Sequence, residues 1–318
     1  APGPGSGKMA TCLSQLYHDH KRGIRAGYAK YETFPIWNLP LKHPVNLAYE
    51  AATADLNDVN MIDPFHLEAY GKTTVNYNRD VEIFPVLNAM FQRIQGSSPY
   101  RSPTDMGVNM AGFAIVDDEA CREASRMEIL RRYYAGMVDR VRGKADDSVV
   151  RKLEIVMQQA DVTPDICPAV AASLQVAEST GMPAGAMVLP DGCIVTGKNS
   201  SLLGPSALLM NAIKALAGID KDLDLLPASI IAPISDMKIS HLGHHNPRLH
   251  SDEVLIALSI SAVTNPLAEL VLKKLDELRG CDAHFSVILS EEDTKLYNRL
   301  GIHVSCEPKY EIKKLYHK

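Results

Sequence analysis

The first dozen residues place the strongest constraint on the fold. They read APGPGSGKMATC, a loop in which glycine recurs at Gly3, Gly5 and Gly7 and which ends in Lys8. Glycines let backbone N–H groups turn toward a bound anion, and the positive end of a helix predicted from about residue 9 adds to the attraction. The pattern predicts a phosphate-binding loop in which Ser6 also takes part, with ATP or another nucleotide and Mg²⁺ as the candidate cofactor.

The loop departs from the Walker pattern at two positions. Pro2 stands where that pattern has glycine, and Met9 stands where it has the hydroxyl that holds magnesium, so Thr11 is the candidate substitute. The alternative is a glycine-rich strand-to-helix turn that only packs. A phosphate-binding loop follows a parallel strand, and since none precedes this one, we expect the first strands of the α/β region to lie outside this sequence.

Composition narrows the class of protein. The 318 residues are 46% hydrophobic, enough for two or three domains with separate cores. A net charge of -5 and the lack of a long Lys/Arg block argue against nucleic acid as a partner. Apolar stretches fall short of a membrane span, and six widely spaced cysteines are typical of reduced thiols. We expect a cytoplasmic protein with neither nucleic acid nor membrane as partner.

Periodicity and turn residues predict an α/β fold class with three domains. These are a P-loop-like α/β region with substrate loops at 1–118, a helical domain at 119–181 and an α/β layer domain at 182–318. In the last domain, the elements expected in chain order are a hairpin at 186–196, a helix at 202–216, a strand at 229–232, helices at 252–262 and 266–278, a strand at 285–289, a helix at 291–300 and a strand at 302–305.

Carboxylates and amides in the first region are candidates for ligand contacts. The apolar run at 113–116 followed by Asp117 has the pattern of a buried strand whose terminal carboxylate binds Mg²⁺, although Asp117 can equally cap the next helix. Four further candidates for substrate contact lie in polar loops, where Asp and Asn are also common turn formers: Asp58, Asp63, Asp105 and Asn109.

A histidine cluster precedes the helix predicted at 252–262. It consists of His241, His244, His245 and His250. Such a cluster can bind a divalent metal, contact a phosphate together with Arg248, or transfer protons, but its spacing also fits surface-loop histidines. We favour His250 paired with Asp252, because a helix starting at 251 or 252 holds His250 at its N-terminus. Cys281 and His284, just before a predicted strand, are a weaker candidate for a nucleophile or ligand.

The hairpin followed by a helix resembles the start of a cytidine deaminase-like fold. Zinc deaminases need the motifs H/C-x-E and P-C-x-x-C for the metal and its proton-transfer glutamate. Here the segment entering the helix reads NSSLL at 199–203, and neither motif occurs. The topology is therefore expected without the zinc ligands.

Several long strings resemble the bacterial family known as domain of unknown function 1846. They are APGPGSGKMATC at 1–12, DLNDVNMIDPFHLEAYG at 55–71, SPTDMGVNM at 102–110, NPRLHSDEVLIALSISA at 246–262 and KKLYHK at 313–318. The resemblance implies a P-loop-like first region, a helical insertion and a C-terminal α/β domain. Family members extend further at the N-terminus, where an α/β region ends in a strand that leads into the glycine loop.

These observations give one leading hypothesis and two alternatives. In the leading one, an enzyme binds a nucleotide or phosphorylated metabolite between its domains and performs phosphoryl or acyl chemistry. Lys8 and the glycine loop hold phosphate, Asp117 holds magnesium, and Arg248 with His250 contacts the second substrate. The alternatives are a non-catalytic ligand-binding or assembly protein, with homo-oligomer formation, and a metal-dependent hydrolase built on the histidine cluster.

Overall fold

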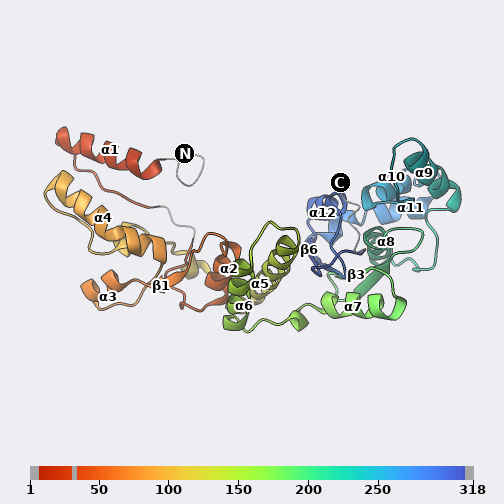
Figure 1. The fold of residues 1–318 in the computed structure, drawn as a ribbon, viewed down its shortest axis with the longest axis horizontal. Helices are drawn as coiled ribbons and strands as arrows, with labels where there is room; N and C mark the ends of the chain where they lie inside the picture. The colour runs from red at the N-terminus through yellow and green to blue at the C-terminus, as the bar shows by residue number, and fades with distance from the viewer. Residues whose placement is uncertain (1–6, 31–33, 312–318) are drawn as a thin grey trace. The chain divides into compact units, whose positions relative to one another are not determined.

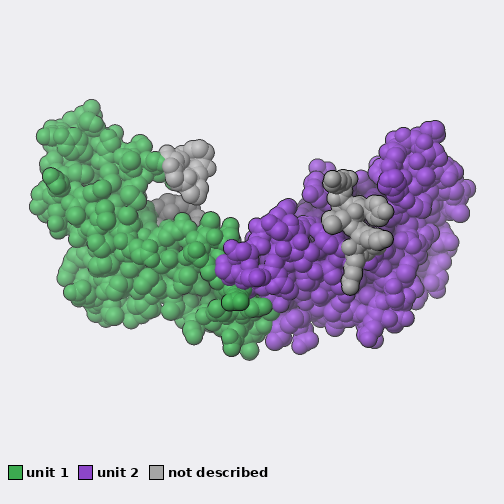
Figure 2. Space-filling view, viewed as in Figure 1, with its two compact units in different colours: residues 1–129, 151–162 green, residues 130–150, 163–318 purple. Residues whose placement is uncertain are grey.

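The computed structural model describes residues 7–30 and 34–311 (Figure 1). The chain has the mixed α/β fold that the sequence predicts. It separates into two compact units, coloured in Figure 2: unit 1 comprises residues 1–129 and 151–162, and unit 2 comprises residues 130–150 and 163–318. Residues 119–181, predicted as a helical domain, are shared between the two units.

Unit 1 is mainly helical and has a two-stranded antiparallel sheet, β1–β2. Its core joins α1 and α4 through Leu16, Phe84, Leu87 and Phe91, with Met106 beside them. Its elements are α1 (Lys8–Lys21), α2 (Pro44–Ala52), β1 (Asn60–Ile62), α3 (Pro64–Tyr70), β2 (Val75–Tyr77), α4 (Asn78–Gln95) and the short 3₁₀ helices η1 (Pro103–Met106) and η2 (Ala111–Ala114). Two helices, α5 (Asp118–Val141) and α6 (Asp147–Gln159), are divided between the units.

The strand predicted at 113–116 is wrong. Residues 111–114 form the 3₁₀ helix η2, and the side chains of Phe113 and Val116 are 68% and 101% exposed. A short apolar run forms a buried strand only where other elements cover it, and here the run leads directly into α5. Asp117 Oδ1 accepts a hydrogen bond from the Ala120 amide at 3.0 Å, which is the helix-capping role weighed against magnesium binding.

Unit 2 is built on a four-stranded sheet in the order β4–β3–β5–β6. Strands β3 (Ala184–Val188) and β4 (Ile194–Lys198) form the predicted hairpin, β5 (Asp282–Phe285) pairs antiparallel with β3, and β6 (His303–Cys306) pairs parallel with β5. In the hairpin turn, Gly192 has φ 83°, and Asp191 Oδ1 accepts a hydrogen bond from the Cys193 amide at 2.9 Å. These are the turn residues from which the hairpin was predicted.

Two helices, α7 (Pro168–Thr180) and α8 (Gly204–Leu216), pack on this sheet. The backbone of α8 approaches β4 so closely that a Cβ added at Gly197 would overlap the backbone of Ala207 and Leu208. Leu208 and Leu209 of α8 are fully buried in the unit 2 core, together with Phe285 of β5. The contact at Gly197 therefore sets the distance between α8 and the sheet.

The rest of unit 2 is mainly helical. It contains η3 (Pro164–Ile166), α9 (Ala228–Ser240), α10 (Ser251–Ser261), α11 (Pro266–Leu272), η4 (Leu275–Leu278) and α12 (Glu291–Arg299). The structure confirms the helices predicted at 202–216, 252–262 and 291–300 to within a few residues, and the strand at 302–305 likewise. No helix in the described residues is long and apolar enough to cross a membrane.

The strand predicted at 229–232 is wrong, because this segment is the first turn of α9. Pro227 directly precedes the helix. Ile230, Ile231 and Ile234 pack against the unit 2 core. That spacing is helical, and a four-residue apolar run cannot by itself distinguish a buried strand from a buried helical turn.

Candidate functional site

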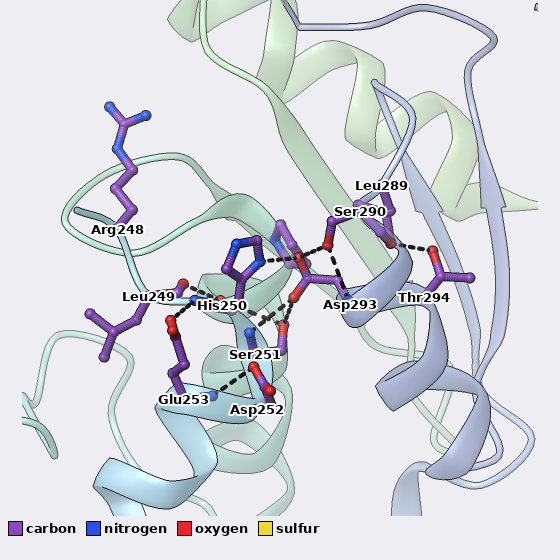
Figure 3. Close-up of polar contacts among 12 residues, drawn as sticks. Arg248, Leu249, His250, Ser251, Asp252, Glu253, Leu289, Ser290, Asp293 and Thr294 are labelled. Carbon is purple, nitrogen blue, oxygen red and sulfur yellow. Dashed lines mark hydrogen bonds and ion pairs between the residues drawn. The ribbon is translucent and has the colours of Figure 1, made fainter. Parts of the chain in front are cut away.

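The candidate site is a histidine–aspartate pair in unit 2 (Figure 3). His250 immediately precedes α10, and Asp293 lies in the first turn of α12. His250 Nδ1 and Asp293 Oδ2 are 2.9 Å apart. The expected position of His250 at the mouth of a helix is confirmed, but its partner is Asp293 and not Asp252, whose Oδ1 accepts a hydrogen bond from the Glu253 amide at 2.9 Å.

Asp293 is held by further hydrogen bonds on both of its carboxylate oxygens. Oδ1 accepts from the Ser251 amide at 2.9 Å and from the Ser251 hydroxyl at 2.7 Å, while Oδ2 accepts from the Ser290 hydroxyl at 2.7 Å. Burial by itself would raise the pKa of Asp293, but the hydrogen bonds from His250, Ser251 and Ser290 outweigh it and hold the pKa below its usual value. This carboxylate, only 2% exposed, is therefore ionised at neutral pH.

The same contacts fix the state of the His250 ring. Because an ionised carboxylate can only accept, Nδ1 carries the proton of the hydrogen bond, and in the neutral ring Nε2 is left with the lone pair. The hydrogen bond to Asp293 raises the pKa of His250, and burial opposes this increase without cancelling it. The side chain is 24% exposed. The arrangement suits proton transfer at Nε2, as in hydrolases where a buried aspartate orients a histidine.

A buried lysine holds the loop that carries His250. Lys238 of α9, 2% exposed, donates from Nζ to the Arg248 carbonyl at 2.8 Å and to Glu253 Oε2 at 2.6 Å. Glu253 Oε2 also accepts from the His250 amide at 2.7 Å. On the far side of the loop, Ser206 of α8 donates from its hydroxyl to the Leu249 carbonyl at 2.7 Å. The backbone at 248–250 is thus fixed from both sides.

Arg248 is adjacent to His250 in the chain, but its side chain points away from the imidazole ring (Figure 3). Its Nε donates to the Ser200 carbonyl at 2.9 Å. Arg248 and His250, both in the segment predicted at 241–250, therefore lie on one fixed loop, but their side chains do not point toward a common ligand position.

The other three histidines of that cluster are exposed: His241, His244 and His245. Among the residues that the structure describes, no three His, Cys, Asp or Glu side chains are grouped so that they could share a metal ion. The geometry therefore gives no support to the metal-dependent hydrolase considered from the sequence.

Only part of the predicted phosphate loop can be placed. Gly3, Gly5 and Ser6 lie outside the described residues. Gly7, with φ 82°, precedes α1, and Lys8 is the first residue of that 14-residue helix. Thr11, the candidate magnesium ligand, donates from its hydroxyl to the Gly7 carbonyl at 3.1 Å.

The four polar candidates in unit 1 make internal contacts. Asp58 is ion-paired with Arg79 at 2.6 Å. Asp63, fully buried, caps α3 through the Phe65 and His66 amides at 3.0 Å, and its other oxygen accepts from the Thr104 hydroxyl at 2.5 Å. Asp105 accepts from the amides of residues 101 and 102, and Asn109 accepts from the amide of residue 111. The contacts of Asp63, Asp105 and Asn109 with nearby amides are those of turn-forming residues, whereas Asp58 has a long-range ion pair.

Two other sequence candidates lie in β5 and directly before it. His284 is fully buried on β5, and its Nδ1 lies 2.8 Å from the Ser305 hydroxyl. Cys281 is also buried, which raises the pKa of its thiol and works against a role as nucleophile. All six cysteines are free thiols.

Asp293 was not predicted from the sequence, and neither were the residues that support the pair: Lys238, Ser251, Glu253 and Ser290. A local signal was present, because Ser290 and Asp293 form an S-x-x-D pattern before an amphipathic helix. In the structure, the Ser290 hydroxyl accepts from the Asp293 amide at 3.1 Å, as such a pattern predicts. The pattern marks the start of α12 but cannot indicate that the carboxylate also meets a histidine 43 residues earlier in the chain.

Comparison with known proteins identifies the family. The sequence matches the family described as "Domain of unknown function DUF1846, N-terminal" over residues 1–161 and its "C-terminal" counterpart over residues 165–316. It is 60% identical to a UPF0371 protein of Streptococcus thermophilus and 59% identical to a UPF0371 protein of Streptococcus pyogenes serotype M5. Each match covers all of this chain and 65% of the relative's length. The chain therefore belongs to the DUF1846 family.

Proposed function

We propose that this chain is part of an enzyme that binds a nucleotide or another phosphorylated metabolite and performs phosphoryl- or acyl-group chemistry, with His250 as its acid–base group. The observation that carries the proposal is the hydrogen bond between His250 Nδ1 and the buried carboxylate of Asp293. Three further hydrogen bonds hold this carboxylate in place, and it fixes Nδ1 of an imidazole whose side chain is 24% exposed.

The pair can act in either direction of proton transfer. With its raised pKa, His250 gives a proton from Nε2 to a leaving group when it is protonated, and it takes a proton from a hydroxyl or water when it is neutral. The negative charge of Asp293 stabilises the imidazolium formed in the second case. Because the Arg248 side chain points away from the ring and donates to the Ser200 carbonyl, we propose it only as a contact for an anionic group of the substrate that lies away from the proton-transfer position.

The start of α1 supports phosphate binding in unit 1. A 14-residue helix has a partial positive charge at its N-terminus, and both Gly7 and Lys8 are exposed there. We propose the same site for ATP or another nucleotide, with Lys8 as the cation. For the fold, we infer a P-loop-like region in unit 1 and a cytidine deaminase-like topology in unit 2, supported by the hairpin β3–β4 followed by α8.

The test uses the full-length protein and separates binding from chemistry. Thermal stability is measured with ATP, pyrophosphate and a panel of phosphorylated metabolites, and any compound that stabilises the protein is then tested for turnover by mass spectrometry. We expect Lys8→Ala to abolish the stabilisation. We expect His250→Gln to keep it but to lower turnover by about 100- to 10,000-fold, the usual effect of losing an acid–base group.

Two outcomes contradict the proposal in different ways. If a ligand stabilises the protein and no product forms, the chain is a binding or assembly protein. If His250→Gln turns over the ligand as fast as the unaltered protein, proton transfer does not occur at this pair. Lys72→Ala, which removes an exposed lysine that also follows a glycine, is the matched control for Lys8→Ala.

A further inference from the structure

A cavity in unit 2 lies apart from the His250–Asp293 pair. Its volume is about 520 Å³, and its walls come from the end of β4, one face of α8, the loop at 221–226 and the start of α9. Neither His250 nor Asp293 lines it. The wall nearest to the candidate site includes Ser200, whose carbonyl accepts the hydrogen bond from Arg248.

One part of the lining is positively charged. Lys198, Lys214 and Lys221 line the cavity, and Asp224 is the carboxylate among the lining residues, which leaves an excess of two positive charges. Lys198 and Lys221 are exposed, whereas Lys214 is only 6% exposed. The cavity thus has one lysine in its interior and two whose side chains reach solvent.

Lys214 has unused hydrogen-bonding capacity. Its Nζ donates to the Lys221 carbonyl at 3.0 Å, and within the described residues it has no other hydrogen bond and no ion pair. An ammonium group has three donors, so two remain for a ligand. Burial lowers the pKa of Lys214, while nearby aspartates of the loop, Asp224 foremost, raise it by a smaller amount. A bound anion would supply the direct partner that these carboxylates do not.

The remaining part of the lining is apolar. Met210 and Leu225 are 5% and 1% exposed, and Ile231 of α9 lines the same space. A small hydrated ion gains nothing from such a wall, whereas a molecule with a charged end and an apolar body can use both parts of the lining.

We infer that this cavity is a binding site for a small organic anion with an apolar or aromatic body, whose phosphate or carboxylate contacts Lys214, Lys198 and Lys221 and whose body lies against Met210, Leu225 and Ile231. The inference does not depend on proton transfer by His250. It assigns to unit 2 a ligand site of its own.

Competitive lysine labelling tests the site on the full chain. Pyridoxal 5′-phosphate has a phosphate, an aromatic ring and an aldehyde, which condenses with a neutral lysine amine to an imine with loss of water. Borohydride then reduces the imine to a stable amine, and peptide mass spectrometry identifies the modified lysine. We expect labelling to concentrate on the three cavity lysines, and we expect phenyl phosphate to suppress it there. Benzyl alcohol has only the aromatic body and inorganic phosphate has only the anionic group, so each should suppress labelling far less.

Matched variants then measure the contribution of the charges. Lys198→Gln combined with Lys221→Gln removes two exposed charges and leaves the fold intact, and we expect it to weaken phenyl phosphate binding about 10- to 100-fold by calorimetry. The control is Lys273→Gln combined with Lys295→Gln, two lysines that are each 68% exposed, one directly after α11 and the other in α12. Lys214→Met should abolish binding, with circular dichroism as the check on folding.

The opposite results overturn the inference. If labelling follows exposure, so that Lys273 and Lys295 react as much as the cavity lysines and phenyl phosphate protects none, the cavity is not an anion site. Equal affinity of the two double variants for phenyl phosphate leads to the same conclusion. Loss of turnover in His250→Gln with labelling unchanged would separate this site from the acid–base proposal.

Discussion

Asp293 serves two purposes with one carboxylate. Its oxygens accept hydrogen bonds that fix the starts of α10 and α12, and the same group orients the imidazole of His250. The structural role of this residue and the chemical role proposed for it are therefore coupled, and experiments on it must measure stability and histidine titration separately.

The first prediction concerns the Asp293→Asn variant. We expect the pKa of His250 to fall, because the amide cannot provide the negative charge that favours the imidazolium. We also expect a loss of about 3 kcal/mol of unfolding free energy, since one partner of a buried pair is removed. NMR titration of the histidine Cε1 protons and urea denaturation measure the two effects. Asp252→Asn, an exposed change in α10 two residues after His250, is the control; an unshifted His250 titration in Asp293→Asn would contradict the assignment.

The second prediction is a pH dependence with a defined sign. Folding raises the pKa of His250, so its stabilising contribution is complete below the unfolded value of about 6.5 and is lost as pH rises through the folded value. The lowered pKa of Asp293 keeps its carboxylate ionised across this range. We expect the difference in unfolding free energy between the unaltered protein and His250→Gln to be largest near pH 5.5 and to shrink toward pH 9. A difference that stays constant between pH 5.5 and pH 9 would contradict this prediction.

At the residue scale, the sequence predicted His250 but not its partner Asp293. The position of His250 can be predicted because residues typical of a helix start follow it directly. Such a start depends on hydrogen bonds between residues close in sequence. Asp293 meets His250 only because α12 packs against α10, so no local rule can connect the two. The same limit explains why Asp252, the nearest carboxylate in sequence, was the wrong choice.

At the scale of secondary-structure elements, the packing of α8 on β4 in unit 2 requires a close approach of the two backbones. The third prediction is that Gly197→Ala lowers the unfolding free energy by about 2 kcal/mol, because the added methyl group must push the α8 backbone away from the sheet. Urea denaturation followed by circular dichroism measures the change. Ile194→Ala, at a 45% exposed position on the same strand, should cost less. A fully stable Gly197→Ala protein would mean that α8 is not seated on β4 as described.

In unit 1, Asp63 connects α3 to η1, because it caps α3 and accepts a hydrogen bond from Thr104. The fourth prediction is that Asp63→Ala costs about 3 kcal/mol, because the change removes the cap of α3 and leaves the buried Thr104 hydroxyl with one acceptor fewer. The control is Glu68→Ala, an exposed change on the same helix, which should stay within about 0.5 kcal/mol. If Asp63→Ala leaves stability unchanged and abolishes ligand binding, the substrate role considered from the sequence is the correct one.

Helices were predictable from the sequence because their signals extend over three or four turns. The α8 pattern, for example, repeats its apolar positions along the whole helix, and α10 and α12 follow residues with clear starting patterns. The strands predicted at 113–116 and 229–232 rested on four apolar residues each, and the strand predicted at 285–289 overlaps β5 only at Phe285. Runs of that length take their structure from what covers them, which lies elsewhere in the chain.

At the scale of the whole molecule, each unit has a hydrophobic core of its own. Trp37, the one tryptophan of the sequence, belongs to unit 1. The fifth prediction is that Gly197→Ala lowers the midpoint of urea unfolding seen by circular dichroism more than the midpoint seen by tryptophan fluorescence. Equal shifts of the two midpoints would show that the units unfold as one.

The family membership and the α/β class were accessible from sequence, because long unusual strings and turn chemistry are sufficient for both. The reaction was not, since the chain spans 65% of the length of the curated relatives it matches and its polar loops look alike whether they bind a substrate or stabilise a turn. The structure gives each of these residues its contacts, a helix cap for Asp63 and a buried carboxylate partner for His250.

The shared carboxylate at position 293 has a consequence for large-scale mutagenesis. A screen that scores cellular abundance would flag this position as intolerant and so conceal any part it has in chemistry, because unstable variants are degraded before their activity can be assayed. Position 250 should behave differently, with near-normal abundance for glutamine or asparagine and a fitness cost only under conditions that demand the reaction. Comparing the two positions across growth conditions would therefore point to the missing substrate.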